Sequence, residues 1–176
     1  MADELASAVA AGPVGALFVL IGPAGCGKST LVSGLPSNTV VSLDELRRQV
    51  CGDPGDQSAT AAAVELQNRL LEQRLGAGLP TVLDSTNVES RVRADLLARA
   101  KRHGRPAVAV RFSTGLDDCL ARNARRVGSS RVPEDVVRRQ HALAVEAGPG
   151  LVREGFARVL LWDGRQLSDG AAGTAR

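Results

Sequence analysis

The sequence predicts a three-layer α/β fold in which a central parallel sheet of about five strands lies between layers of helices. Short apolar runs alternate with helical segments along most of the chain, which is the pattern of repeated βαβ units. The first run, residues 16–21, is continuously apolar, as expected of a strand covered on both faces. A glycine-rich turn follows this run and leads into a helix. A chain of 176 residues is long enough to bury the core of one such domain.

The first half of the chain contains local signals for each element. A helix at 28–34 opens directly after the glycine-rich turn, and a short β-branched strand follows at 39–41. The next helix, 44–51, ends at a Gly-Asp-Pro-Gly-Asp sequence, which predicts a loop over residues 52–57. Apolar residues recur at helical spacing over 59–75, and two glycines and a proline close this helix.

The second half of the chain repeats this alternation. Gly104 ends one predicted helix, and Pro133 is well placed in the first turn of another. The remaining strands are expected at 81–84, 107–112 and 158–162. The remaining helices are expected at 89–103, 116–126 and 133–147.

These elements define one domain over residues 15–165. Residues 1–14 are small and alanine-rich and are expected to form a loose N-terminal segment. Residues 166–176 end in a run of small residues with little to bury, so we expect a disordered tail.

The composition is that of a globular protein, with 44% hydrophobic and 23% charged residues. Only 2% of the residues are aromatic, which argues against a nucleic-acid binder that stacks bases on aromatic side chains. The net charge is +3, and the only two lysines among the 22 basic residues are Lys28 and Lys101. A lysine retained in so arginine-rich a chain raises the question of what an arginine could not do at that position.

The sequence contains no segment suited to a membrane. The longest apolar run, residues 14–21, is far shorter than the roughly 20 residues that span a bilayer, and the acidic start of the chain differs from a signal peptide. The three cysteines lack metal-binding spacing and are odd in number, which favours a reducing compartment. We therefore expect a cytoplasmic protein with no membrane partner.

Residues 22–29, Gly-Pro-Ala-Gly-Cys-Gly-Lys-Ser, match the pattern G-x-x-x-x-G-K-[ST] between a strand and a helix, the context that a P-loop requires. Glycines let the backbone wrap around phosphate oxygens. Lys28 is expected to reach the β- and γ-phosphates, where a guanidinium would be too large, and Ser29 to bind Mg²⁺. The expected nucleotide-binding residues are Gly22, Pro23, Ala24, Gly25, Cys26, Gly27, Lys28, Ser29 and Thr30.

Charged side chains follow the second and third predicted strands, where ligands bind in open parallel sheets. Asp44 can accept a proton from an attacking hydroxyl, and Arg47 lies one helical turn further on the same face. The alternative is an N-capping aspartate with a surface arginine. Asp84 ends the third strand and is expected to hold a water of Mg²⁺, and Asn87 is expected to cap the next helix.

This ordered set of motifs resembles the kinase domain of 5′-polynucleotide kinases of the phage and bacterial end-healing types, over about residues 17–162. The resemblance implies a P-loop kinase fold in which Asp44 is the general base on the 5′-hydroxyl and Arg47 contacts the 3′-phosphate of the acceptor. Asn87 and Arg91 would also contact the acceptor. Within these 176 residues we expect a kinase domain without the phosphatase or ligase domains that those enzymes carry.

Residues 119–133 resemble the lid of the same family, and the whole lid is expected at about 118–140. Arg122 and Arg131 match its catalytic arginines best, with Arg126 as the next match. Six arginines between positions 122 and 139, with a Gly-Ser-Ser hinge, also suit a mobile cationic flap on physical grounds. The alternative is a solvated helix face.

The sequence thus predicts an enzyme that uses ATP and Mg²⁺ to phosphorylate a 5′-hydroxyl of DNA or RNA. One alternative is a P-loop kinase of a small-molecule hydroxyl, such as a nucleoside, sugar, antibiotic or nucleotide-sugar. Another is a nucleotide-binding regulatory module with little turnover, although such a module needs no base like Asp44. The expected ligands are a nucleoside triphosphate and either a 5′-hydroxyl nucleic acid end or a small hydroxyl acceptor. For the oligomeric state, the sequence leaves both a monomer and a homodimer as alternatives.

Overall fold

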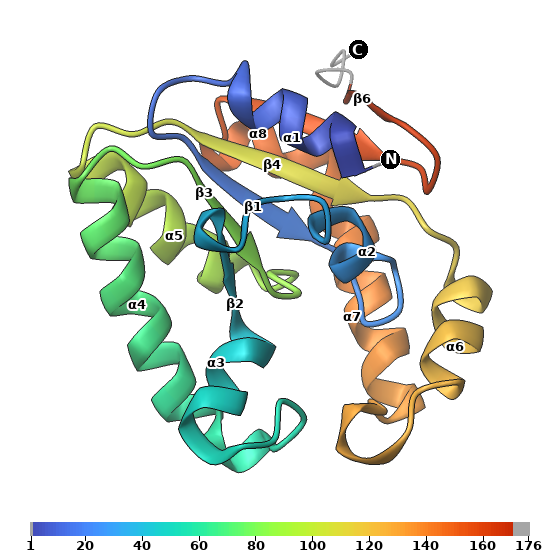
Figure 1. Ribbon diagram of the computed structural model, residues 1–176. Coiled ribbons are helices and arrows are strands. Elements are labelled where there is room, and N and C mark those ends of the chain that lie inside the picture. The colour runs from blue at the N-terminus through green and yellow to red at the C-terminus, as the bar shows by residue number, and fades with distance from the viewer. Residues whose placement is uncertain (1, 171–176) are drawn as a thin grey trace.

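The computed structural model describes residues 2–170 and has the predicted three-layer α/β architecture (Figure 1). Its sheet has six strands in the order β2-β3-β1-β4-β5-β6. The first five run parallel, and β6 pairs antiparallel with β5 at the edge. The strands are β1 (Leu17–Ile21), β2 (Val40–Ser42), β3 (Thr81–Asp84), β4 (Ala107–Phe112), β5 (Arg158–Trp162) and β6 (Leu167–Asp169).

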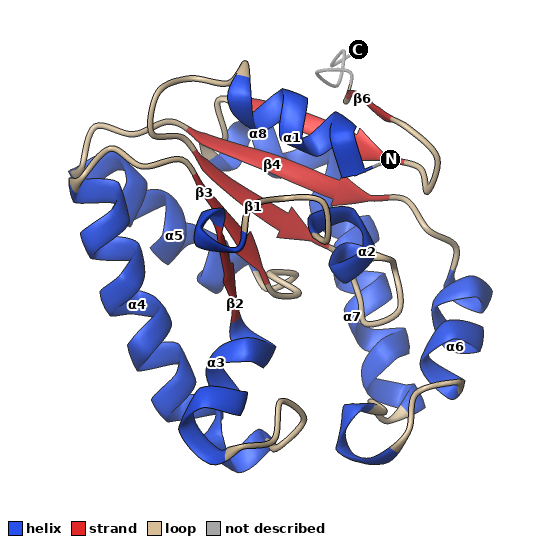
Figure 2. Ribbon diagram, in the orientation of Figure 1, coloured by secondary structure: helices blue, strands red, loops and turns tan. Residues whose placement is uncertain are grey.

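Helices cover both faces of this sheet (Figure 2). They are α1 (Ala2–Ala10), α2 (Lys28–Val32), α3 (Leu43–Cys51), α4 (Thr60–Gly76), α5 (Ser90–Arg102), α6 (Leu116–Ala124), α7 (Glu134–Ala147) and α8 (Leu151–Glu154). Short 3₁₀ turns, η1 (Ser37–Thr39), η2 (Gln57–Ala59), η3 (Gly128–Ser130) and η4 (Gly148–Gly150), join some of them.

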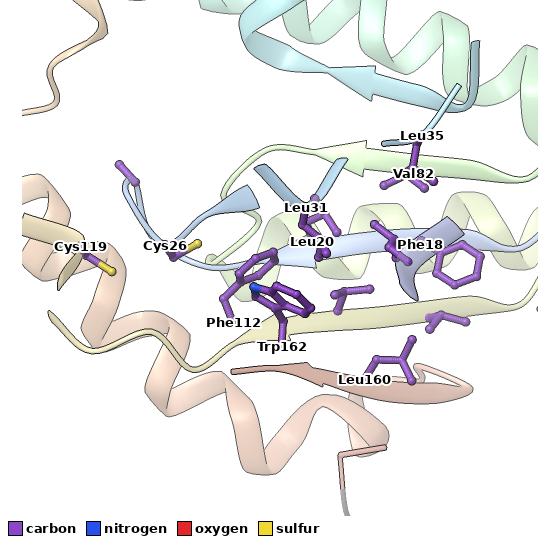
Figure 3. Packing of buried hydrophobic residues seen from close by; sticks show 14 of the residues in the cluster. Phe18, Leu20, Cys26, Leu31, Leu35, Val82, Phe112, Cys119, Leu160 and Trp162 are labelled. Carbon is purple, nitrogen blue, oxygen red and sulfur yellow. The ribbon is translucent and has the colours of Figure 1, made fainter. Parts of the chain in front are cut away.

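The side chains of β1 alternate between two hydrophobic cores, which explains why this strand is apolar throughout. Phe18 and Leu20 pack with Phe112 and Trp162 in the core beneath α1 and α2 (Figure 3). The residues between them on β1 face the second core, which α4, α5 and α8 close. The central strand is thereby fixed on both sides, and the glycine-rich turn at its carboxyl end is held in a defined place.

The predicted loose segment 1–14 is wrong for the residues that the structure describes. α1 is a helix whose Leu5 is fully buried in the core with β1. The Glu4 carboxylate accepts a hydrogen bond of 2.6 Å from the backbone N–H of Leu167 in β6. The helix and the edge strand therefore stabilise each other, although they come from opposite ends of the chain.

The predicted tail 166–176 is wrong where it overlaps β6, which pairs with β5 through registers such as Leu161 with Ser168. The rest of the predicted tail, residues 171–176, lies outside the described residues. The short helix α8, whose Leu151 is fully buried, was also not predicted. Within residues 2–170, none of the helices has the length and apolar character needed to cross a membrane.

Candidate active site

A cleft of about 1240 Å³ opens at the carboxyl ends of the parallel strands, where ligands bind in sheets of this kind. One arm of the cleft consists of α3, α4 and the start of α5, and the other consists of α6 and α7 (Figure 1). The volume is larger than the roughly 300–1,000 Å³ of common small-molecule pockets, so two ligands can be held together.

The glycine-rich loop forms the floor of the cleft between β1 and α2. Gly25 and Gly27 have φ angles of +80° and +104°, which the loop needs for its tight turns and which glycine adopts without strain. The Lys28 ammonium donates hydrogen bonds of 2.8 Å to the carbonyl oxygens of Gly22 and Pro23. The lysine thus lies across the loop, at the place where phosphate oxygens would bind.

The predicted nucleotide-binding residues of this loop fall into two groups. Six of them line the cleft, namely Ala24, Gly25, Gly27, Lys28, Ser29 and Thr30. The other three, Gly22, Pro23 and Cys26, do not line it: the Gly22 N–H donates to the carbonyl of Thr86, the Pro23 carbonyl accepts from Lys28, and Cys26 is buried in the core. Burial raises the pKa of the Cys26 thiol, which favours its protonated form.

Residues on the arm made of α6 and α7, which the sequence analysis missed, hold this glycine-rich loop in place. The Gln140 side-chain oxygen of α7 accepts a hydrogen bond of 2.9 Å from the Ala24 N–H. The Thr114 hydroxyl, just before α6, donates to the Cys26 carbonyl at 2.9 Å. A Cβ on Gly25 would collide with the backbone of Cys119 in α6. No local pattern reveals these contacts, because each joins segments far apart in the sequence.

Asp84 ends β3 beside Ser42 of the neighbouring strand. Burial raises the pKa of the Asp84 carboxyl, the nearby Lys28 partly offsets this effect, and Asp44 adds to it. Because nearby positive groups only partly offset its burial, this carboxylate is suited to bind a cation. Asp84 and Ser29 both line the cleft.

These two residues fit Mg²⁺, which commonly uses one or two protein ligands together with substrate phosphates. Within the described residues there is no cluster of three or more His, Cys, Asp or Glu side chains that could hold a metal by itself. A cation at Asp84 would therefore depend on the phosphates of a bound nucleotide.

Asp44, on the first turn of α3, forms an ion pair with Arg47, one turn further along the helix. The Asp44 side chain is 64% exposed and lines the cleft. Arg47 is only 8% exposed, and its Nε donates a hydrogen bond of 2.7 Å to the carbonyl of Pro54. The alternative of a capping aspartate with a surface arginine is wrong, because Ser42 is the N-cap residue of α3 and Arg47 is buried.

Asn87 and Arg91, the other two predicted acceptor contacts, lie on the same arm. Asn87 is buried, and its amide donates a hydrogen bond of 2.8 Å to the carbonyl of Leu20 in β1. It does not cap the next helix, since Glu89 is the N-cap residue of α5. Arg91 has a side chain that is 85% exposed and pairs with Glu89 at 2.8 Å.

A buried arginine that the sequence analysis missed braces the turn after β3. Arg93 is 2% exposed and donates hydrogen bonds to the carbonyl oxygens of Asn87 and Val88, at 3.2 and 2.6 Å. Its other nitrogens bind both carboxylate oxygens of Glu154 at 2.7 Å. These contacts tie the turn that follows Asp84 to α8.

The predicted lid arginines line the opposite side of the cleft. Arg122, Arg126 and Arg131 all face it, whereas Arg125 does not. A guanidinium nitrogen of Arg122 lies 3.6 Å from where a Cβ on Gly27 would be, so this arginine is directly beside the glycine-rich loop. The lid thus places positive charge around the expected phosphate position.

The tip of the lid touches the opposite arm. The Ser129 hydroxyl donates a hydrogen bond of 2.7 Å to Asp53, and Gly55 packs so closely on Ser129 that it has no room for a Cβ. The base of this tip is fixed by Asn123, which exchanges hydrogen bonds of 2.7 and 3.1 Å with the backbone of Val132.

A mostly parallel sheet with a glycine-rich loop, an adjacent lysine and a cationic lid defines a P-loop nucleotide-binding protein of the kinase-like class. More particularly, the chain belongs to the AAA domain family AAA_33, whose model matches residues 17–147. No curated protein sequence matches the chain.

Solved structures share the fold at low sequence identity. A structure of the PezAT chromosomal toxin-antitoxin system of Streptococcus pneumoniae aligns with a TM-score of 0.68 and 15% identity, covering 99% of this chain and 83% of that one. Kti12 of Chaetomium thermophilum with ADP-AlF3 aligns with a TM-score of 0.59 and 18% identity, covering 85% and 89%. AvrRxo1-ORF1:AvrRxo1-ORF2 with sulphate ions aligns with a TM-score of 0.67 and 19% identity, covering 96% of this chain. This chain spans 61% of that AvrRxo1 chain.

Proposed function

We propose that the protein is a kinase that transfers the γ-phosphoryl group of ATP to a hydroxyl group of a second ligand. The observation that carries this proposal is the position of Asp44. Its exposed carboxylate lies in the same cleft as the glycine-rich loop and close enough to Asp84 to influence that residue's pKa. A protein that only binds a nucleotide needs no such proton acceptor beside the phosphate site.

The glycine-rich loop and the lid would hold the nucleotide. On binding, the Lys28 ammonium would exchange its two loop carbonyls for the β- and γ-phosphate oxygens. Arg122, Arg126 and Arg131 would neutralise the charge that develops on the transferred group. The structures of Kti12 with ADP-AlF3 and of AvrRxo1 with ATP support nucleotide binding by this fold.

Ser29 and Asp84 would hold Mg²⁺, which would supply positive charge against the negative charge of the nucleotide phosphates. The acceptor oxygen forms a bond to the γ-phosphorus as the bond from that phosphorus to the bridging oxygen breaks, and ADP leaves. The acceptor proton passes to the Asp44 carboxylate. Arg47 holds Asp44 in place through their ion pair.

The geometry favours a small hydroxyl compound as the acceptor. Arg47, expected to contact an acceptor phosphate, already binds Asp44 and the Pro54 carbonyl. The contact between Ser129 and Asp53 joins the two arms of the cleft, which suits an enclosed ligand. The order of motifs still supports a second candidate, the 5′-hydroxyl end of DNA or RNA.

Labelled ATP separates these candidates. The protein is incubated with Mg²⁺ and γ-³²P-ATP against nucleosides, sugars, antibiotics and nucleotide-sugars with free hydroxyls, and against 5′-hydroxyl DNA and RNA oligonucleotides. Label on small compounds alone supports the first acceptor class, and label on oligonucleotides supports the second. If ATP binds but no compound is labelled, the kinase proposal fails in favour of a regulatory module.

A further inference from the structure

Gln67 interrupts the buried face of α4. Four residues of this helix, spaced four apart, are buried: Ala63, Gln67, Leu71 and Leu75. Three of them are apolar and pack in the core against the sheet. Gln67 is 7% exposed, and its Oε1 atom has no hydrogen-bond partner among the described residues. Because an unpartnered buried acceptor costs stability, this side chain calls for a reason beyond packing.

The same residue lines the cleft. Around it on this wall are Thr60, Val64 and Asn68 of α4 and Val92 of α5. The wall therefore combines neutral hydrogen-bonding groups with apolar surface, which is the composition of sites that recognise small neutral molecules.

The charged groups of this arm do not favour an anionic ligand. Both arginines are engaged, Arg47 by Asp44 and Arg91 by Glu89. Asp95 also lines the cleft here, and its carboxylate binds Arg99 of the same helix. A phosphate-bearing acceptor would meet carboxylates and occupied guanidinium groups, whereas a neutral compound would meet hydrogen-bonding partners.

We propose that Gln67 determines acceptor specificity: its amide oxygen accepts a hydrogen bond from an N–H or O–H group of a neutral hydroxyl compound. This inference rests on the proposed kinase function, which places the reacting hydroxyl of that compound at Asp44. A site built to hydrogen-bond a donor discriminates strongly against an analogue without it, because the protein group then stays buried and unpaired. Gln67 is thus a specificity-determining residue and takes no part in the bond changes.

The test uses pairs of acceptors that differ by one donor group, with γ-³²P-ATP and Mg²⁺. Suitable pairs are adenosine with purine riboside, guanosine with inosine, and glucose with 2-deoxyglucose. The variants are Gln67→Leu, which removes the hydrogen-bond-accepting oxygen of the side chain, and Gln67→Glu, which keeps such an oxygen. Gln73→Leu is the matched control, because Gln73 is exposed on the same helix and does not line the cleft.

We expect the wild-type protein to prefer the donor-bearing member of at least one pair. Gln67→Leu should lower kcat/KM for that member by about 10- to 100-fold and abolish the preference. Gln67→Glu should retain the preference, and Gln73→Leu should behave as wild type. The affinity for ATP and the Tm should not fall in Gln67→Leu, since the variant loses only an unpartnered polar group.

Different failures are distinguishable. Transfer with equal use of both members of every pair, or a preference that persists in Gln67→Leu, overturns the role of Gln67 and leaves the kinase function standing. A large drop in the Tm of Gln67→Leu also overturns it, because the glutamine would then serve the fold. If the wild-type protein binds ATP and labels none of these compounds or the wider panel, the proposed function itself fails.

Discussion

The Ser129 hydroxyl donates a hydrogen bond of 2.7 Å to the Asp53 carboxylate, although 76 positions separate the two residues in the sequence. Ser129 belongs to η3 at the tip of the lid, and Asp53 to the loop after α3. The bond therefore joins the two arms of the cleft. We therefore expect the contact to hold the lid over a bound ligand, as lids do in other enzymes.

Ser129→Ala should accordingly speed the release of nucleotide. An exposed hydrogen bond contributes about 0.5–1.5 kcal/mol, so we expect dissociation to be faster by about 2- to 10-fold. Stopped-flow fluorescence with a labelled ATP analogue measures this rate. Ser130→Ala is the control, because Ser130 lines the same cleft and its hydroxyl makes no bond to Asp53. Equal release rates for Ser129→Ala and wild type would show that the contact does not restrain the lid.

Lys28→Ala should abolish phosphoryl transfer and leave the fold intact. The lysine is only partly buried and binds two carbonyl oxygens of its own loop, so its loss removes little from the core. Turnover and a thermal melt are measured side by side. Lys101→Ala provides a matched control, since the second lysine of the chain is exposed on α5. Wild-type turnover in Lys28→Ala would remove the glycine-rich loop from the reaction.

Asp84→Asn should stabilise the protein without ligands at neutral pH. The folded-state pKa of Asp84 is raised above 3.8, so the folded protein holds this proton more tightly than the unfolded chain. The stability that this proton contributes is fully present below about pH 3.8 and is lost as the pH rises through the folded-state pKa. The variant, neutral at every pH, should thus melt a few degrees above wild type at about pH 7.

The same variant tests the proposed Mg²⁺ site. Near pH 3.8 its Tm should match wild type, and at about pH 7 it should gain less stability from Mg²⁺ and ATP than wild type does. Calorimetric melts at both pH values measure this. A variant that melts with wild type at every pH, and gains as much from Mg²⁺ and ATP, would show that the Asp84 carboxylate is neither destabilised by burial nor used for the cation.

Arg93→Met should destabilise the fold strongly. The substitution leaves Glu154 and the carbonyl oxygens of Asn87 and Val88 without their donor. Removing one partner of a buried ion pair costs about 3–5 kcal/mol, and the partial exposure of Glu154 places the cost toward the lower end. Urea unfolding gives the free energy of unfolding. Arg91→Met, at an exposed position of the same helix, should change it by less than about 0.5 kcal/mol, and a similar small change in Arg93→Met would contradict the bracing role.

How far the sequence predicted the molecule depended on how local each signal was. The glycine-rich loop, β3 and β4 were predicted at their observed positions because apolar runs and glycine spacing act within a few residues. α1 and β6 were missed because each is held by distant parts of the chain: Leu5 of α1 is buried in the core with β1, β6 pairs with β5, and Glu4 bonds to Leu167. A fold prediction from local pattern sees neither partner as structured.

The residues of the candidate site also divide into those that local motifs predict and those that depend on distant contacts. Lys28, Asp44 and Arg122 line the cleft, as the motifs implied. The functions of Gln140 and Gln67 depend on what surrounds their amides, and an isolated glutamine in a helix carries no sign of this. Arg47 was expected to be free for a ligand, but folding occupies it with Asp44 and the loop after α3.

The single-turnover rate of γ-phosphoryl transfer by Asp44→Asn tests the kinase account most directly. Asparagine has nearly the same shape and keeps an oxygen for Arg47, yet it cannot accept the proton of an acceptor hydroxyl. With the acceptor that wild type labels most efficiently, we predict a rate lower by about 10²- to 10⁴-fold and an unchanged Kd for ATP. A rate equal to that of wild type would contradict the account, because the site would then have no general base at Asp44.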